Sequence, residues 1–158
     1  MNYDHYADVR FTQDYQLFLF DSVGPKGKLK KAVIYSELKD FPGIYNIGLG
    51  TIKMDDNGKE YIDGSEISDN GDRNKILATV ALTALEFINK HPDSKIYLTG
   101  IDKARTRLYQ MAINHAYEDL CYTFTIQGDL SENEGVYDLH PFTRNVNYTG
   151  FVIAKRLL

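Results

Sequence analysis

The sequence predicts an α+β protein: one mixed, mostly antiparallel sheet with two main helices, in the element order ββββαβαββ. Short β-like segments separated by glycine-containing turns come first in the 158-residue chain, and helical patterns begin only near residue 72. Each helical pattern is followed by a further β-like segment, and a strand that follows a helix can lie parallel to a neighbour through a right-handed crossover. Because the chain has no internal repeat and no long linker, we expect residues 1–158 to form a single globular domain.

The first two strands are expected to form a hairpin. Residues 15–22 and 29–35 are rich in aromatic and β-branched side chains, and Gly24-Pro25-Lys26-Gly27 provides a turn between them. Four lysines lie at the turn and early in the second arm: Lys26, Lys28, Lys30 and Lys31. We interpret them as solvent-facing residues of an edge strand.

A second hairpin is predicted from residues 44–54 and 60–62. The Asn57-Gly58 pair between them suits a tight turn, and Gly48 and Gly50 indicate a bulge or a close approach to the backbone. Acidic residues are frequent from position 55 to 72, but their spacing does not match a calcium-binding EF-hand loop. Solvated turns are the alternative that we favour.

Residues 72–89 and 102–117 show the periodicity of helices, with a short strand over 95–99 between them. We expect Asp69 or Asn70 to cap the first helix and Pro92 to end it. The last strands are predicted over 121–127 and 148–154. The apolar faces of these elements predict a core that includes Leu77, Val80, Ala81, Leu85, Leu108, Ala112 and Phe124.

Composition excludes several classes of function. The net charge of -4 and the pI near 5.5 argue against broad nucleic-acid binding. No segment is typical of a signal peptide or a membrane span, and the single Cys121 fits a reducing compartment, so we expect a cytoplasmic protein. The histidines have no metal-ligand spacing, and the motifs of serine hydrolases, P-loop proteins and dinucleotide-binding folds are absent. We therefore expect no metal and no cofactor.

One segment carries a functional hypothesis, the basic start of the second helix over residues 100–109. Three cations lie where the helix dipole is already positive, an arrangement that an anion would stabilise. The candidate ligand-binding residues are Gly100, Lys103, Arg105, Thr106, Arg107 and Tyr109. The bound group would be the phosphate of a nucleotide or of RNA. Alternatively, the arginines form ion pairs and Asp102 simply caps the helix.

Several segments resemble an uncharacterised family of small proteins of Bacteroidota. They are Tyr15-Gln16-Leu17-Phe18, Ser22, Gly24-Pro25-Lys26-Gly27, Ile44-Tyr45-Asn46-Ile47-Gly48, Asn70-Gly71-Asp72, Ile76-Leu77-Ala78-Thr79-Val80 and Ala104-Arg105-Thr106-Arg107-Leu108-Tyr109-Gln110-Met111. The resemblance covers nearly the whole chain and implies one compact cytosolic domain. It marks Arg105, Thr106, Arg107 and Tyr109 as part of the family's characteristic segment, and it supplies no activity.

Two alternative functions stay open. The element order is similar to the later part of GCN5-related N-acetyltransferases, and that resemblance implies Tyr109 as the acid that protonates a departing thiolate. Residues 69–74, however, place acids where such an enzyme needs an acyl-CoA phosphate loop. The other alternative is a protein-interaction module, such as one half of a toxin-antitoxin pair or a homo-oligomer, because the twelve tyrosines can provide contact surface.

Overall fold

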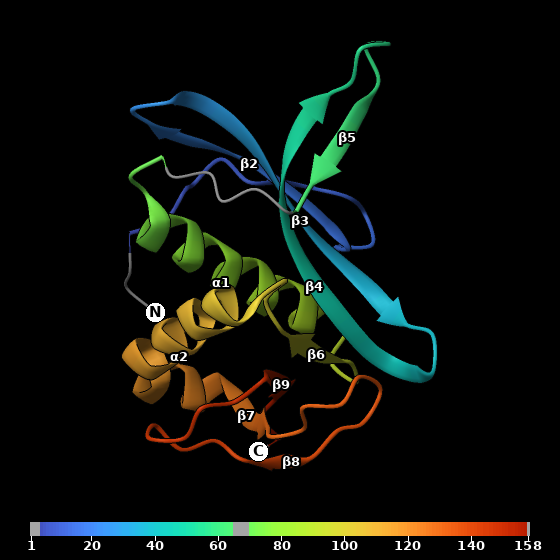
Figure 1. Ribbon diagram of the computed structural model, residues 1–158, viewed down its shortest axis with the longest axis vertical. Coiled ribbons are helices and arrows are strands. Elements are labelled where there is room, and N and C mark those ends of the chain that lie inside the picture. The colour runs from blue at the N-terminus through green and yellow to red at the C-terminus, as the bar shows by residue number, and fades with distance from the viewer. Residues whose placement is uncertain (1–3, 65–69, 158) are drawn as a thin grey trace. The chain divides into compact units, whose positions relative to one another are not determined.

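The computed structural model of the protein describes residues 4–64 and 70–157. Within these ranges the chain forms two helices and nine strands (Figure 1). In chain order they are β1 (Arg10–Phe11), β2 (Leu17–Gly24), β3 (Gly27–Leu38), β4 (Phe41–Met54), β5 (Glu60–Asp63), α1 (Arg73–Lys90), β6 (Lys95–Leu98), α2 (Lys103–Thr123), β7 (Phe124–Asp129), β8 (Leu139–Pro141) and β9 (Gly150–Lys155). The predicted order is confirmed in outline, with two short exposed strands, β1 and β8, added to it.

All the strands of the described chain belong to one mixed sheet. The strand order is β1-β2-β3-β4-β6-β9-β7-β8, and β5 pairs with β4 beside this path. β4 and β6 are parallel, with Ile44 opposite Lys95. Antiparallel pairs join β1 to β2, β2 to β3, β4 to β5, β6 to β9, β7 to β9 and β7 to β8. The predicted mixed, mostly antiparallel sheet is therefore confirmed.

The chain divides into two compact units. The C-terminal unit consists of Glu37–Ile47 and the chain from His91 onward, and the N-terminal unit consists of the chain before residue 37 together with Gly48–Lys90. Strands β3 and β4 contribute residues to both units. The expectation of a single domain over residues 1–158 stays a prediction.

In the N-terminal unit, the predicted hairpin joins β2 to β3 through Pro25 and Lys26. Gly24 faces Gly27, which has a φ of 87° that glycine adopts without strain. The predicted edge position of the second arm is wrong, because β3 lies between β2 and β4.

The same strand corrects the prediction for one lysine. Lys26, Lys28 and Lys30 are exposed, as expected, but Lys31 is only 3% exposed and its Nζ donates to Thr51 Oγ1 at 2.6 Å. Consecutive strand residues point to opposite faces, so Lys31 lies on the face opposite to Lys28 and Lys30.

The second predicted hairpin joins β4 to β5. Gly58 has a φ of 76° at the Asn57-Gly58 turn, as the sequence indicates. Gly50 is a site of close approach, because a Cβ there would lie 2.5 Å from Ile62 Cγ2 and 3.0 Å from the Asp63 carbonyl oxygen. Gly48 has open space around it.

Helix α1 agrees with the predicted range but buries a different face. Its buried residues are Ile76, Thr79, Val80, Thr83, Ala84, Phe87 and Ile88. Of the core residues that were predicted in this helix, only Val80 is buried, and Leu77, Ala81 and Leu85 are half-buried. The hydroxyls of Thr79 and Thr83 donate within the helix, to the carbonyls of Lys75 and Val80. These threonines can therefore pack among apolar side chains.

One of the two predicted caps of α1, Asn70, has a different role. Asn70 is buried, and its side chain accepts from Lys26 N and donates to Ser22 Oγ and the Gly27 carbonyl. It therefore ties down the β2–β3 turn. The other candidate, Asp69, lies outside the described residues.

In the C-terminal unit, α2 is longer than predicted. It runs on to Thr123, and the Phe124 N–H still bonds to the Leu120 carbonyl, so the strand expected from residue 121 begins at Phe124. Cys121 lies in the last helical turn, half-buried, and its thiol donates to the Glu118 carbonyl at 3.2 Å. Of the predicted core, Phe124 is buried, and Leu108 and Ala112 are half-buried.

Candidate functional site

The start of α2 is a closed hydrogen-bonded turn. Asp102 is the N-cap, as the alternative to anion binding predicts, and its Oδ1 accepts from Arg105 N at 2.8 Å. The Asp102 carbonyl accepts from Thr106 N and from Thr106 Oγ1, each at 3.1 Å. Thr106 Oγ1 in turn accepts from Gly100 N at 2.9 Å. The amides of Gly100, Arg105 and Thr106 are therefore already satisfied by the protein.

Gly100 has a structural reason to be glycine. A Cβ at this position would lie 2.5 Å from Thr106 N and 2.6 Å from Arg105 Cβ. The group that approaches the Gly100 backbone is thus the first turn of α2 itself. Thr106 is buried and holds the same contact.

The three cations of this segment separate into two directions. Lys103 and Arg107 are exposed and lie four residues apart, so they share one face of the helix. Within the described ranges neither of them forms an ion pair. Arg105 is half-buried and lies about 200° around the helix from Arg107. The structure therefore brings Lys103 and Arg107 together and places Arg105 elsewhere.

Tyr109 lies near Arg105 rather than near the exposed cations. Burial raises the pKa of Tyr109 above the ordinary tyrosine value, and the neighbouring Arg105 charge opposes that rise. A raised pKa makes the phenol a weaker acid, so this environment does not favour the proton-donor role that the acetyltransferase resemblance implies.

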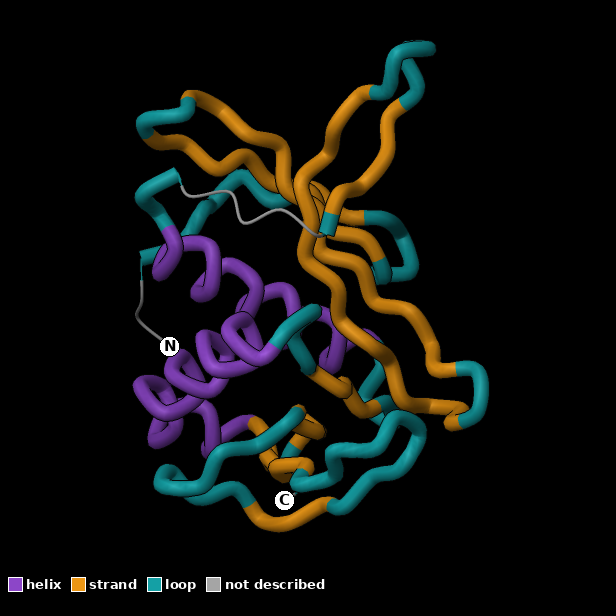
Figure 2. The backbone as a smooth tube through the Cα atoms, viewed as in Figure 1, coloured by secondary structure: helices purple, strands orange, loops and turns teal. Residues whose placement is uncertain are grey.

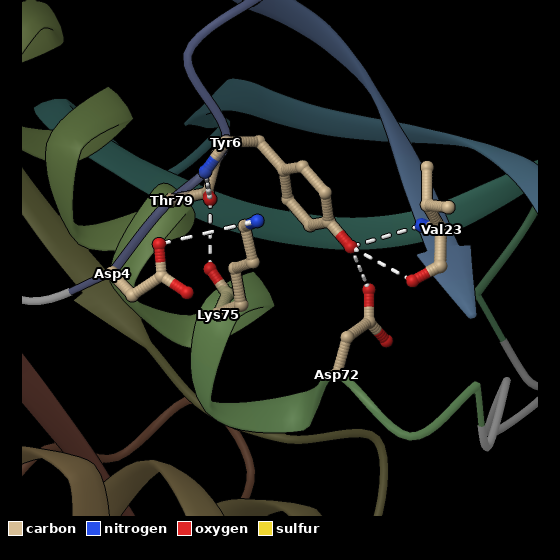
Figure 3. Close-up of polar contacts among 6 residues, drawn as sticks. All are labelled: Asp4, Tyr6, Val23, Asp72, Lys75 and Thr79. Carbon is tan, nitrogen blue, oxygen red and sulfur yellow. Dashed lines mark hydrogen bonds and ion pairs between the residues drawn. The ribbon is translucent and has the colours of Figure 1, made fainter.

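A polar cluster at the start of α1 was not predicted (Figure 3). Tyr6 OH donates to Asp72 Oδ2 at 2.5 Å and accepts from Val23 N at 2.9 Å, and Ser22 Oγ donates to the same carboxylate oxygen at 2.6 Å. Burial and the bond to Asp72 raise the pKa of Tyr6. Among the residues that the structure describes, none is a hydrogen-bond partner of the buried Asp72 Oδ1 atom.

The chain around Tyr6 is fastened at three further points. The Tyr6 N–H donates to Thr79 Oγ1 at 2.9 Å, and Tyr6 stacks on Phe20 with ring centroids 5.6 Å apart. Lys75 Nζ lies 4.4 Å from the Tyr6 ring centroid, and Figure 3 shows it between that ring and Asp4. The contacts hold the segment before β1 against α1 and β2. No short-range sequence signal could reveal this cluster, because Tyr6 and Asp72 are far apart in the chain.

A second cluster lies in the C-terminal unit, around the buried Asp129. Its Oδ1 accepts from Ser131 N at 2.9 Å and from Asp138 N at 3.0 Å, and its Oδ2 accepts from Tyr97 OH at 2.8 Å. Burial and the bond to Asp129 raise the pKa of Tyr97. Both carboxylate oxygens are therefore partnered, and the loop between β7 and β8 is tied to β6.

The described chain shows neither a metal-ligating cluster nor a membrane-spanning helix. No group of three or more histidines, cysteines and carboxylates in residues 4–64 and 70–157 could hold a metal ion. Neither helix of the described chain is both long and apolar enough to cross a bilayer. The expectation of a cytoplasmic location stays a prediction.

The fold defines a small α+β protein with a self-capped basic helix start. The chain belongs to a family whose model matches residues 2–156 and carries the description "Family of unknown function (DUF6934)". This match confirms the whole-chain resemblance to a family without an established activity. It gives no support to a Bacteroidota origin or to a likeness to GCN5-related N-acetyltransferases. No curated protein and no solved structure matches the chain.

Proposed function

We propose that this protein binds a phosphate-bearing anion, such as a nucleotide or an RNA phosphate, at the start of α2 through Lys103 and Arg107. The observation that carries the proposal is that these two exposed cations share one helix face and have no ion pair in the described chain. An anion between them would receive two charge-assisted hydrogen bonds.

The charge at this helix end supports the proposal. The first turn of α2 contains no acidic residue, and Asp102 is the carboxylate that caps it. Lys103, Arg105 and Arg107 together outweigh that one negative charge at the positive end of the helix dipole. Arg105 adds to the positive field without reaching the same ligand.

The backbone leaves donors for a ligand. The first amides of a helix have no intrahelical acceptor, and the Asp102 side chain accepts from that of Arg105. In the part of the chain that the structure describes, the amides of Lys103 and Ala104 have no acceptor, and they lie in the same helical turn as the exposed Lys103 side chain. In this scheme Gly100 and Thr106 shape the turn, and Tyr109 and Arg105 lie outside the ligand contacts.

Thermal unfolding tests this function. Phosphate, sulfate and AMP should each raise the melting temperature at low ionic strength, whereas sodium chloride at matched ionic strength should not. A ligand at ten times its dissociation constant stabilises the folded state by about 1.4 kcal/mol. The double variant Lys103→Ala with Arg107→Ala should lose the response.

A matched control is Lys39→Ala with Lys59→Ala, which removes two exposed positive charges outside α2. This variant should keep the response to phosphate. An equal loss in both double variants would mean that net charge alone is sensed, and a full response in the α2 variant would exclude the site.

A second candidate function, a protein-interaction module, is favoured by one observation. Phe41 and Tyr137 are exposed and in ring contact, with centroids 5.0 Å apart.

For the acetyltransferase alternative, isothermal titration with acetyl-CoA is the direct test. We expect no binding tighter than the millimolar range.

A further inference from the structure

An aromatic face lies on the C-terminal unit, where the loop after β7 runs beside the start of β4 (Figure 2). Tyr137 is at its centre, with ring centroids 5.0 Å from Phe41 and 5.2 Å from Tyr97, both in edge-on contact. Phe41 and Tyr137 are each 36% exposed, and their neighbours Val136 and Leu139 are 55% and 38% exposed. We call these five residues the aromatic face.

The aromatic face is held in place by hydrogen bonds to Asp129. Asp129 binds the Tyr97 hydroxyl with one oxygen and the loop amides of Ser131 and Asp138 with the other. The loop is also fixed by the bond from Leu130 N to the Asp138 carbonyl at 2.9 Å. An exposed apolar surface on a fixed loop loses little conformational entropy when a partner binds.

The charged residues of the two segments that form the aromatic face are mostly acidic. Glu132, Glu134 and Asp138 lie in the same loop and are exposed, and residues 129–140 contain no lysine or arginine. In the chain just before Phe41, Glu37 and Asp40 are exposed, and the exposed Lys39 lies between them in the sequence. We call these acidic residues, Glu37, Asp40, Glu132, Glu134 and Asp138, the acidic rim. Their negative charge repels phosphate, so a nucleic acid does not fit here.

We propose that the aromatic face binds a protein partner through a basic segment that carries an apolar anchor. The anchor packs on Tyr137 and Phe41, and lysine or arginine side chains of the partner pair with Glu132 and Glu134. Exposed aromatic residues surrounded by complementary charge are typical of the energetic centre of protein interfaces. The acidic rim selects a partner with positive charge, and the aromatic rings provide the contact area.

This binding surface is separate from the anion site proposed at α2, because its residues and the sign of its charge differ. The same chain also offers Lys103 and Arg107 beside the exposed Ile101, which have the chemistry of the expected partner segment. A second copy of this chain is therefore an alternative occupant that the experiment must distinguish.

Fluorescence anisotropy with two labelled synthetic peptides tests the proposal. One short peptide alternates lysine with leucine, and the other alternates glutamate with leucine. The full chain should bind the basic peptide at least about tenfold more tightly than the acidic one, with an affinity that falls as salt rises.

Variants locate the binding. Phe41→Ser with Tyr137→Ser should weaken binding of the basic peptide about tenfold or more, and Glu132→Gln with Glu134→Gln should weaken it severalfold and reduce its dependence on salt. The first control is Tyr122→Ser, which changes an exposed aromatic residue of α2. The second control is Asp56→Asn with Glu60→Gln, which changes two exposed acidic residues of the β4–β5 hairpin. Both controls should leave binding unchanged.

Three results would overturn the proposal. Equal binding of the two peptides would remove the charge argument, and equal losses in the control variants would show that binding is not confined to this face. The third is concentration-dependent self-association in sedimentation that both Phe41→Ser with Tyr137→Ser and Lys103→Ala with Arg107→Ala abolish, because the occupant would then be a second copy. If the double aromatic variant does not fold, Val136→Ser and the glutamate variant decide, since all three residues are exposed.

Discussion

Replacing Asp129 by alanine should lower the free energy of unfolding by about 3–5 kcal/mol, because three hydrogen bonds to one buried carboxylate are lost together. Asp129 is 2% exposed and is the shared acceptor of Tyr97 OH, Ser131 N and Asp138 N. The alanine methyl group accepts none of these bonds. The loop between β7 and β8 would lose its link to Tyr97 of β6.

The three separate hydrogen bonds of Asp129 set this magnitude. A hydrogen bond to a charged group contributes about 1.5–3 kcal/mol net, so three such bonds set an upper limit that non-additivity lowers. Asp129→Asn should cost only about 0.5–1.5 kcal/mol. The asparagine carbonyl can still accept from Ser131 N and Asp138 N, and its amide can donate to a reoriented Tyr97 hydroxyl.

Urea unfolding of the wild type, Asp129→Ala, Asp129→Asn and Tyr97→Phe, monitored by circular dichroism, measures these differences. A double-mutant cycle between Tyr97→Phe and Asp129→Asn should give a coupling energy of about 0.5–3 kcal/mol. If Asp129→Asn lowers the free energy of unfolding as much as Asp129→Ala does, the acceptor role of the side-chain oxygen is not what stabilises the loop. Strictly additive effects of Tyr97 and Asp129 would refute their interaction.

Two further predictions concern the helix starts. Gly100→Ala should lower the melting temperature without phosphate present, because its Cβ would meet Thr106 N at 2.5 Å, and unchanged stability would contradict the tight turn. Tyr6→Phe should cost about 1.5–3 kcal/mol, since the ring stays but the bond to Asp72 is lost. The folded-state pKa of Tyr6 is raised above 10.0, so this contribution is complete below pH 10.0 and fades as the pH rises through the raised value. The difference between wild type and Tyr6→Phe in urea should therefore shrink at alkaline pH, and a constant difference would refute the role of the phenol proton.

The sequence predicted the fold well where local signals are strong. Gly27 and Gly58 mark the two hairpin turns, both with positive φ, and Asp102 caps α2 as expected. Strands β1 and β8 were missed because they are two and three residues long and exposed throughout, so they carry no apolar alternation.

Other predictions were wrong because some side chains do not follow the usual burial or secondary-structure preference of their residue type. The buried face of α1 includes Thr79 and Thr83, whose hydroxyls are satisfied within the helix, and an apolar pattern gives them no weight. Lys31 was assigned to solvent, but a long side chain can bury its stem and bring its amine to Thr51. The end of α2 was placed too early because Tyr122 and Thr123 favour strands in isolation.

The candidate site was predicted only in part. Charge placement pointed to the α2 start, and helix periodicity already separates Arg105 from Arg107, but neither could show that Thr106 and Gly100 bond to each other. The contacts of Tyr6 with Asp72 and of Tyr137 with Phe41 join residues distant in the chain. Such contacts depend on tertiary structure. Composition and local periodicity carry no information about which distant residues meet.

The position of β9 has a consequence for synthesis on the ribosome. β9 pairs with β6 on one side and with β7 on the other, although it is the last of the three to be made. Until Gly150–Lys155 has emerged, the nascent chain exposes the edges of β6 and β7 that β9 will later cover, and unpaired edges invite association with other chains. The C-terminal unit therefore completes its sheet only after translation has passed β9.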